Sequence, residues 1–301
     1  MDNALLVIVL GILSTTQLHL AKAMQRQGIE VYDRIQARLK GTGEQITGGA
    51  KKPAIYVVGV VLNQVEFIYP ILAQPYGPPA LFTSMFGMGL VALMFYAALV
   101  MKESIGRLEV IGSGLIVAGT LTIGIENLWR DDYDRFQMDV GAMLAVLLMV
   151  LGLAIAAMVL AYKRGSVNQI GLVFGLGAGA LGGLDPFLKG VGQNLGGNPA
   201  FLPRTAPGMV LFVSSFVIGF LAFATTQVGF ARKARASVLV PAYDSAYVVL
   251  PVLLQTFLLP SYRLYWTTVL GIGGILAGIV LMRAFGREPG RHPRGSLGNA
   301  A

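Results

Sequence analysis

The chain has 301 residues, of which 55% are hydrophobic and only 13% are charged. Its mean hydropathy of +0.67 lies far above what a soluble globular chain can accommodate, so the composition excludes a soluble protein and indicates an integral membrane protein. The absence of cysteine excludes disulfides and thiolate metal sites.

Nine apolar runs follow one another along the chain. An α-helix needs about 20 such residues to cross about 30 Å of hydrocarbon. We place the spans at 4–24, 53–73, 79–101, 108–125, 139–161, 168–190, 208–230, 237–258 and 265–283. The sequence therefore predicts an all-α integral membrane protein with nine transmembrane helices.

Two segments outside the spans have their own patterns. In the loop 25–52, apolar residues recur at helical spacing from Ile29 to Leu39, which predicts a short interfacial helix. The tail 286–301 is polar and rich in Gly and Pro, so we expect it to be disordered.

The cations are distributed unevenly between the two sets of alternate loops. Lys22 and Lys189 lie within spans, and the side of the membrane on which the chain starts has only Arg130, Arg135, Arg204 and Arg263. All other Lys and Arg residues lie on the opposite side, which by the positive-inside rule is the cytoplasmic side. We therefore expect an external N-terminus and a cytoplasmic C-terminus, in a bacterial inner membrane. The net charge of +8 follows from this topology and indicates no nucleic-acid partner.

The two halves of the chain share short sequence patterns. Gln64-Val-Glu-Phe matches Gln227-Val-Gly-Phe at an offset of 163 residues, and similar offsets align the glycines at 112–119 with those at 271–278 and Lys22 with Lys189. These matches pair spans 1–4 with spans 6–9 and leave span 5 as a connector. An odd number of crossings separates the copies, so the repeat is inverted, which is the simplest route to alternating access. The expected units are 1–126, with four spans, and 127–285, with five.

Small residues and prolines predict local packing in the second half. Glycines at every fourth position from Gly171 to Gly183 should let a neighbouring helix approach span 6 closely. Asp185 precedes Pro186, and Pro241 lies three residues before Asp244. Because proline frees a backbone carbonyl one turn back, we expect helix disturbances beside both acids.

Three acids lie inside spans, namely Glu66, Asp185 and Asp244. A charged acid near the bilayer centre costs roughly 2.5–3.5 kcal/mol, so such residues usually serve a function. They can ligate a divalent cation, for which we name Glu66 and Asp244 with the amides of Asn63, Gln64 and Gln227. They can instead carry a coupling proton or pair with an organic cation, and the alternative without function is an interhelical hydrogen bond.

Three basic residues accompany these acids. Lys22 and Lys189 near opposite membrane faces are expected to snorkel to the headgroups, with a counter-charge role as the alternative. His19, one turn before Lys22, is a candidate proton relay, although a hydrogen-bonded packing histidine is the interpretation that we favour.

Several motifs resemble the NIPA-type magnesium transporters of the drug/metabolite transporter superfamily. The first half contributes PAIYVVGVV, ALFTSMFG, ALVMKES and VIGSGLIVAG, and the second contributes Lys189-Gly190, Gln227, Lys233-Ala234 and SVLVPAY with Tyr243. The resemblance covers almost all of residues 4–285. It implies two inverted helical bundles with a substrate path between them, Mg2+ as the substrate, and Tyr243 among the substrate-binding residues.

The chain also departs from this family. The family's acid in the second span falls on Asn63, whereas Glu66 stands where the family has an amide. Asp185 and Asp244 occupy places of small or aromatic residues, and PYGPP at 75–79 is an insertion. These departures concern magnesium selectivity more than the fold.

We therefore expect a secondary transporter that works by alternating access on Mg2+ or another divalent cation. The alternatives are a proton-coupled carrier of a small metabolite, organic cation or lipid-linked molecule, and a non-transporting subunit of a membrane complex. A homodimer or a complex partner is compatible with each. The sequence shows no nucleophile and base pair, no paired histidines and no phosphate loop, so we expect neither an enzyme nor a cofactor.

Overall fold

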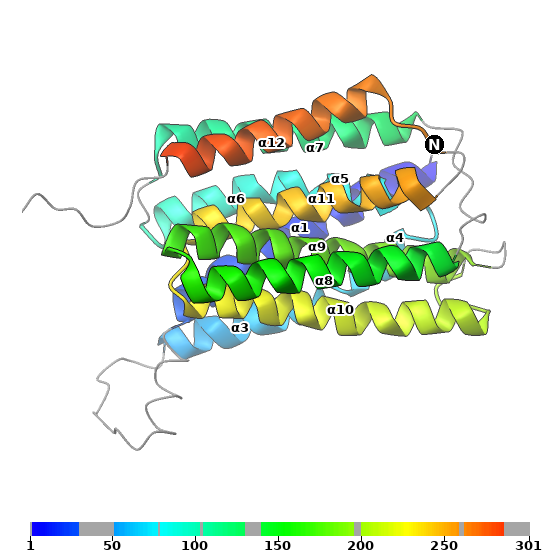
Figure 1. Cartoon of the computed structure of the whole chain (residues 1–301), viewed down its shortest axis with the longest axis horizontal. Coiled ribbons are helices and arrows are strands. Elements are labelled where there is room, and N and C mark those ends of the chain that lie inside the picture. The colour runs from blue at the N-terminus through cyan, green and yellow to red at the C-terminus, as the bar shows by residue number, and fades with distance from the viewer. Residues whose placement is uncertain are drawn as a thin grey trace, which may run out of the picture.

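The fold is taken from a computed structural model that describes residues 2–29, 51–77, 79–102, 105–129, 140–195, 200–258 and 262–285. Every regular element in these ranges is a helix (Figure 1). The helices are α1 (Asp2–Gly28), α3 (Lys51–Val65), α4 (Ile68–Ala73), α5 (Pro79–Ser84), α6 (Phe86–Leu99), α7 (Arg107–Leu128), α8 (Val140–Arg164), α9 (Val167–Asn194), α10 (Ala206–Ala231), α11 (Ala236–Leu258) and α12 (Trp266–Phe285). The prediction of an all-α chain is confirmed for the described residues.

Eight of the predicted spans correspond to helical stretches long and apolar enough to cross a membrane. They are Ala4–Gly28, Pro53–Ala73, Pro79–Leu99, Arg107–Leu128, Gly141–Arg164, Val167–Asn194, Ala206–Ala231 and Ala236–Leu258. The apolar stretch of α12, Trp266–Leu281, is shorter than these. The molecule is thus a multi-pass helical membrane protein, and the ninth span stays a prediction.

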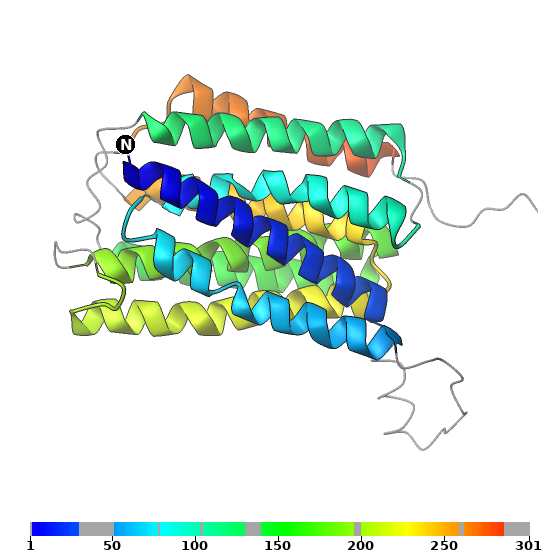
Figure 2. The ribbon, with the colours of Figure 1, turned by 180° about the vertical axis from the view of Figure 1, so that it is seen from behind.

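The helices run side by side along the long axis of the molecule (Figures 1 and 2). Helices α7 and α12 form a pair at one edge, whereas α3 and α10 lie at the opposite edge. The middle is occupied by α9 and α11, whose most apolar windows are 78% and 72% buried. The corresponding window of α8 is only 11% buried although its hydropathy is the highest of all, so α8 faces lipid along most of its surface.

Glycine allows the two central helices to pack closely. A Cβ atom at Gly175, Gly179 or Gly183 of α9 would collide with the backbone of α11 at Leu239, Tyr243 or Tyr247. Only a glycine permits this approach. The close packing predicted from the sequence is therefore confirmed at these three glycines but not at Gly171, where a Cβ would make an ordinary contact, and it brings the Asp244 segment of α11 directly against α9.

The edge pair α7–α12 packs by the same principle. A Cβ at Gly278 would lie 2.5 Å from the carbonyl oxygen of Gly112, and one at Gly271 would lie 2.8 Å from that of Gly119. The two contacts are related by the offset that the sequence suggests for the repeat. The inverted repeat itself stays a prediction.

The helix breaks differ from those expected. Helices α9 and α11 continue through Pro186 and Pro241, so the predicted disturbances beside Asp185 and Asp244 are wrong. Met85 separates α5 from α6, and in the segment that carries Glu66 an interruption at Glu66 and Phe67 separates α3 from α4. Pro70 explains it: proline has no N–H to donate to the carbonyl four residues earlier, and the Glu66 oxygen accepts from Tyr69 N at 3.1 Å instead.

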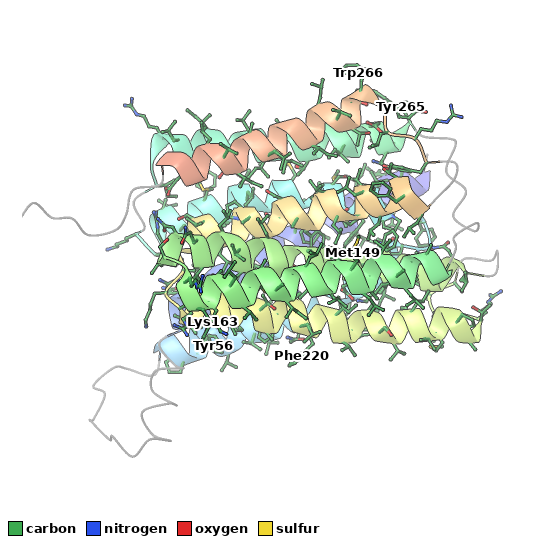
Figure 3. The ribbon with its side chains drawn as sticks, in the orientation of Figure 1. Tyr56, Met149, Lys163, Phe220, Tyr265 and Trp266 are labelled. Carbon is green, nitrogen blue, oxygen red and sulfur yellow. The ribbon has the colours of Figure 1, made fainter. Side chains whose placement is uncertain are left out.

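The two ends of the bundle differ in their exposed side chains. Trp266, Tyr265 and Trp129 are exposed at the end where the first helix begins, and Lys163 and Arg164 lie at the other end (Figure 3). The interfacial helix expected at 29–39 lies almost wholly outside the described residues, and the tail 286–301 lies outside them entirely.

Candidate functional site

A cavity of about 90 Å³ lies in the middle of the bundle between the first and second halves of the chain. It has room for a small polar group and a few waters. Helices α1, α3, α9, α10 and α11 all contribute to its wall. The charged and ionisable side chains in that wall are Lys22, Glu66, Asp185, Lys189, Tyr243 and Tyr247. Among the predicted site residues, Asn63 and Gln64 also line it.

Glu66 enters the cavity from the break between α3 and α4. The residue is 9% exposed, and its Oε1 accepts a hydrogen bond from the hydroxyl of Ser14 on α1. Val61 and Val65 of the same segment are exposed on the lipid-facing side, whereas Glu66 is turned into the bundle. The deepest acid predicted from the sequence thus lines the cavity wall.

Asp185 and Lys189 form an ion pair one turn apart on α9. Both residues are buried, and Lys189 Nζ also lies 4.5 Å from the ring centre of Phe216 on α10. The expectation that Lys189 snorkels to the headgroups is wrong, because its ammonium is enclosed by the bundle. The alternative reading, a counter-charge to an acid, describes the observed contact.

Lys22 is the second cation of the cavity wall, and it too is buried rather than snorkelling. Its ammonium lies 2.8 Å from the ring centre of Tyr243, a cation–π contact. It interacts electrostatically with Asp244 and Glu66. Among the described residues, Lys22 Nζ has no hydrogen-bond partner, which leaves its donors free for a ligand or water.

His19 and Asp244 join α1 to α11 behind this wall. His19 Nε2 lies 2.5 Å from Asp244 Oδ2, and both side chains are fully buried. On the other side of the ring, Nδ1 lies 2.6 Å from the carbonyl oxygen of Thr15, which can only accept. The imidazole is thus held between the backbone of α1 and the carboxyl group of Asp244 on α11.

The predicted amides separate into two groups. Asn63 and Gln64 line the cavity, whereas Gln227 lies outside it in a chain of hydrogen bonds. Gln227 Nε2 donates to Gln25 Oε1 at 2.5 Å, and the Tyr56 hydroxyl donates to Gln227 Oε1 at 3.0 Å. This network connects the two halves at the end of the bundle that contains Lys163.

The two acids named as metal ligands do not share the cavity. Glu66 lines it, but Asp244 is not among its lining residues and is held by His19. Across the described ranges, no group of three or more His, Cys, Asp or Glu side chains is arranged to hold a metal ion. The side-chain oxygen donors in the cavity wall are the carboxyl groups of Glu66 and Asp185, the amide oxygens of Asn63 and Gln64, and the hydroxyls of Thr226, Tyr243 and Tyr247.

Sequence reasoning missed several residues of the site. Ser14, which holds Glu66, and Tyr247, which lines the cavity one turn after Tyr243, are examples. The phenylalanines Phe216, Phe220 and Phe223 of α10 also line it. A polar Ser-Thr pair within the first apolar run was the available signal for Ser14. Nothing in the sequence distinguishes these phenylalanines from those that face lipid.

These features define the class of the protein: a multi-pass helical membrane protein with buried charges around a central cavity. Comparison of the chain with protein-family models, with curated proteins and with solved structures finds no match to any of them.

Proposed function

We propose that the chain is a secondary transporter that binds a small charged substrate in the central cavity and moves it by alternating access. The observation that carries this proposal is the set of four buried charges, Lys22, Glu66, Asp185 and Lys189, around one cavity. Each charge inside a membrane costs roughly 2.5–3.5 kcal/mol, and a merely structural bundle has no need for four.

The two halves both contribute to the cavity, which is the arrangement that rocking around a central site needs. Lys22 and Glu66 come from the first half, and Asp185 and Lys189 come from the second. Under the inverted repeat predicted from the sequence, the two halves exchange conformations to open one side or the other. The proposed orientation with an external N-terminus rests on the positive-inside rule, and the exposed Lys163 and Arg164 lie at the end that it assigns to the cytoplasm.

The balance of charge favours an organic substrate over a bare metal ion. Two ammonium groups line the same cavity as two carboxyl groups, and the ammoniums repel a divalent cation. We therefore propose a proton-coupled carrier of an organic substrate, with Glu66 as the group that exchanges the proton. Mg2+ is the second candidate, favoured by the carboxyl groups of Glu66 and Asp185 and the amide oxygens of Asn63 and Gln64 in the wall.

Flux measurements in proteoliposomes separate the two candidates. Vesicles carry a pH-sensitive dye or a magnesium-sensitive dye, and are challenged with Mg2+ and with a panel of organic acids, amines and zwitterions. We expect an organic compound to move protons in the wild type but not in Glu66→Gln, with no magnesium signal. A magnesium signal lost in Glu66→Gln would establish the second candidate. Absence of any flux in wild-type vesicles would contradict the transporter proposal.

A further inference from the structure

The cavity reaches the surface through the flank of the bundle, between α3–α4 and α10. Its lining includes Phe67 on one side and Phe220 on the other, which are 40% and 60% exposed. Figure 3 shows Phe220 at the outer edge of α10. The neighbouring surface is apolar, with Val61 and Val217 exposed beside the opening. A surface of this kind faces hydrocarbon, so the opening faces the interior of the membrane.

Two contacts between these helices delimit the opening, which we call the lateral mouth. The rings of Phe67 and Phe216 meet with centres 5.6 Å apart, and the Tyr56 hydroxyl donates to Gln227. Along two antiparallel helices, the residue number rises on one helix as it falls on the other, so the numbers of any two facing residues add to the same total. The Phe67–Phe216 and Tyr56–Gln227 pairs share one such total. The same rule places Gln64 opposite Gly219. Gly219 has no side chain to bridge the gap, and a Cβ there would already lie 3.3 Å from Asp185 Cγ.

Hydrogen bonds connect the halves at both ends of the cavity. Towards one end, Gln227 donates to Gln25. Towards the other, Gln193 Nε2 donates to the Ile71 carbonyl at 2.9 Å, and Asn194 Nδ2 lies 3.4 Å from the Gln74 carbonyl. The conformation is therefore held together at its aqueous ends while its lining extends to the lipid-facing flank.

The chemistry inside the lateral mouth is set by Lys22. Glu66 is engaged by Ser14, and Asp185 is engaged by Lys189. Lys22 is 2% exposed, and within the described chain its ammonium has an aromatic ring beside it but no hydrogen-bond acceptor. A buried ammonium without an acceptor is costly, so this position favours an anionic oxygen group that can supply one. Lys189 adds a second positive charge to the same wall.

We propose that the cavity binds the anionic headgroup of a membrane amphiphile, which enters sideways through the lateral mouth and places its oxyanion on Lys22. The hydrocarbon chain stays in the lipid against Phe220 and Phe223. A soluble phosphate or carboxylate has the same headgroup chemistry, but the apolar flank around the opening selects for the amphiphile. The inference rests on the proposed function only in taking the cavity as the substrate site.

Equilibrium binding of radiolabelled dodecyl phosphate to the full chain in phosphatidylcholine nanodiscs tests the headgroup. Empty nanodiscs correct for partition into lipid. We expect saturable binding of one molecule per chain, weakened at least about 10-fold by Lys22→Gln and largely restored by Lys22→Arg, because charged hydrogen bonds of this kind contribute about 10-fold or more. Lys163→Gln, at the exposed end of α8, is the matched control and should bind as the wild type does.

Competition identifies the source of the anion. Dodecyltrimethylammonium has the same chain with the opposite charge, and inorganic phosphate has the charge without the chain. Neither should displace dodecyl phosphate at equal concentration. Equal potency of inorganic phosphate would overturn the membrane amphiphile as the ligand. Equal binding by wild type and Lys22→Gln, or binding that does not saturate, would overturn the anion site.

A reversible cross-link tests the lateral route. The chain contains no cysteine, so the double variant Gln64→Cys/Phe220→Cys carries the only two thiols, one on each side of the lateral mouth. A short bis-thiosulfonate reagent joins them, and reduction releases them. We expect the cross-linked form to bind dodecyl phosphate at least about 10-fold more slowly, with recovery after reduction, whereas an unchanged rate would contradict lateral access.

The results also separate this inference from the proposed function. Proton-linked flux of a soluble compound without dodecyl phosphate binding would remove the inference and leave the transporter. Lys22-dependent binding of dodecyl phosphate without any flux would support the inference and remove the transporter.

Discussion

His19 Nε2 lies 2.5 Å from Asp244 Oδ2, and this contact joins α1 to α11. Both side chains are fully buried, and the imidazole is fixed from behind by the carbonyl oxygen of Thr15. The pair stands directly behind Lys22 and Tyr243, since Asp244 follows Tyr243 in α11 and His19 precedes Lys22 by one turn. It therefore holds together the two helices that form the Lys22 side of the cavity.

Breaking this pair on one side should destabilise the protein. Asp244→Asn leaves His19 with no carboxyl partner, and a buried pair that loses one member typically costs about 3–5 kcal/mol. Thermal unfolding of the purified variant in detergent measures the loss. The double variant His19→Gln/Asp244→Asn should be less destabilised than the sum of the single changes, because removing both partners leaves no charge unpaired. Strict additivity would show that the two groups do not interact.

The helices themselves were predictable because a membrane span must satisfy its backbone hydrogen bonds internally. Runs of apolar residues therefore mark the helices, and eight expected spans occur where the runs lie. The glycine ridge of α9 was predictable for a related reason, since a glycine at every fourth residue has few uses besides close helix packing. These features depend on residues near one another in the sequence.

The arrangement of the site was less predictable because its contacts join distant segments. His19 and Asp244 are separated by 225 residues, and no local pattern indicates that they meet. Pro186 and Pro241 were expected to break their helices, yet the break lies four residues before Pro70. The effect of a proline in a membrane helix depends on which neighbours satisfy the freed carbonyl, and that information is tertiary. Burial of Lys22 and Lys189 depends on tertiary packing in the same way.

The ridge of α9 provides a test of how closely the central helices pack. In Gly179→Ala, the new methyl group would collide with the backbone of Tyr243, and overpacking of this kind costs about 1–3 kcal/mol. Gly152→Ala in α8 is the control, because a Cβ there meets no described atom within 4 Å. It should be neutral or stabilise by about 0.5–1 kcal/mol. Thermal unfolding of the two variants compares them, and equal stability would contradict the close contact.

Pro70 should control the position of Glu66. Pro70→Ala restores an N–H to the carbonyl of Glu66, so that α3 and α4 can join and the carboxyl group rotates away from Ser14. We expect thermal stability to stay equal or rise, while proton-linked flux in proteoliposomes falls at least about 10-fold, as expected when a transported group loses its geometry. Pro207→Ala is the control, since Pro207 lies at the start of α10, where a missing N–H has no consequence. Unchanged flux in Pro70→Ala would show that the break is not needed.

The hydrogen bond between Tyr56 and Gln227 should hold one end of the cavity closed. Tyr56→Phe removes this bond between the halves, whereas Tyr69→Phe removes a bond to Gln17 within the first half and serves as the control. Losing one such bond shifts the balance of open and closed states by about 0.5–1.5 kcal/mol, or roughly 2–10-fold.

A cysteine that replaces Phe223 in the cavity wall measures this opening. Its rate of reaction with a charged thiosulfonate that does not cross membranes reports how often the cavity is open to water. The rate should rise by that factor in Tyr56→Phe alone, because the reagent reaches the thiol only through an aqueous opening. Equal rates in the two tyrosine variants would mean that the Tyr56–Gln227 bond does not act as a gate.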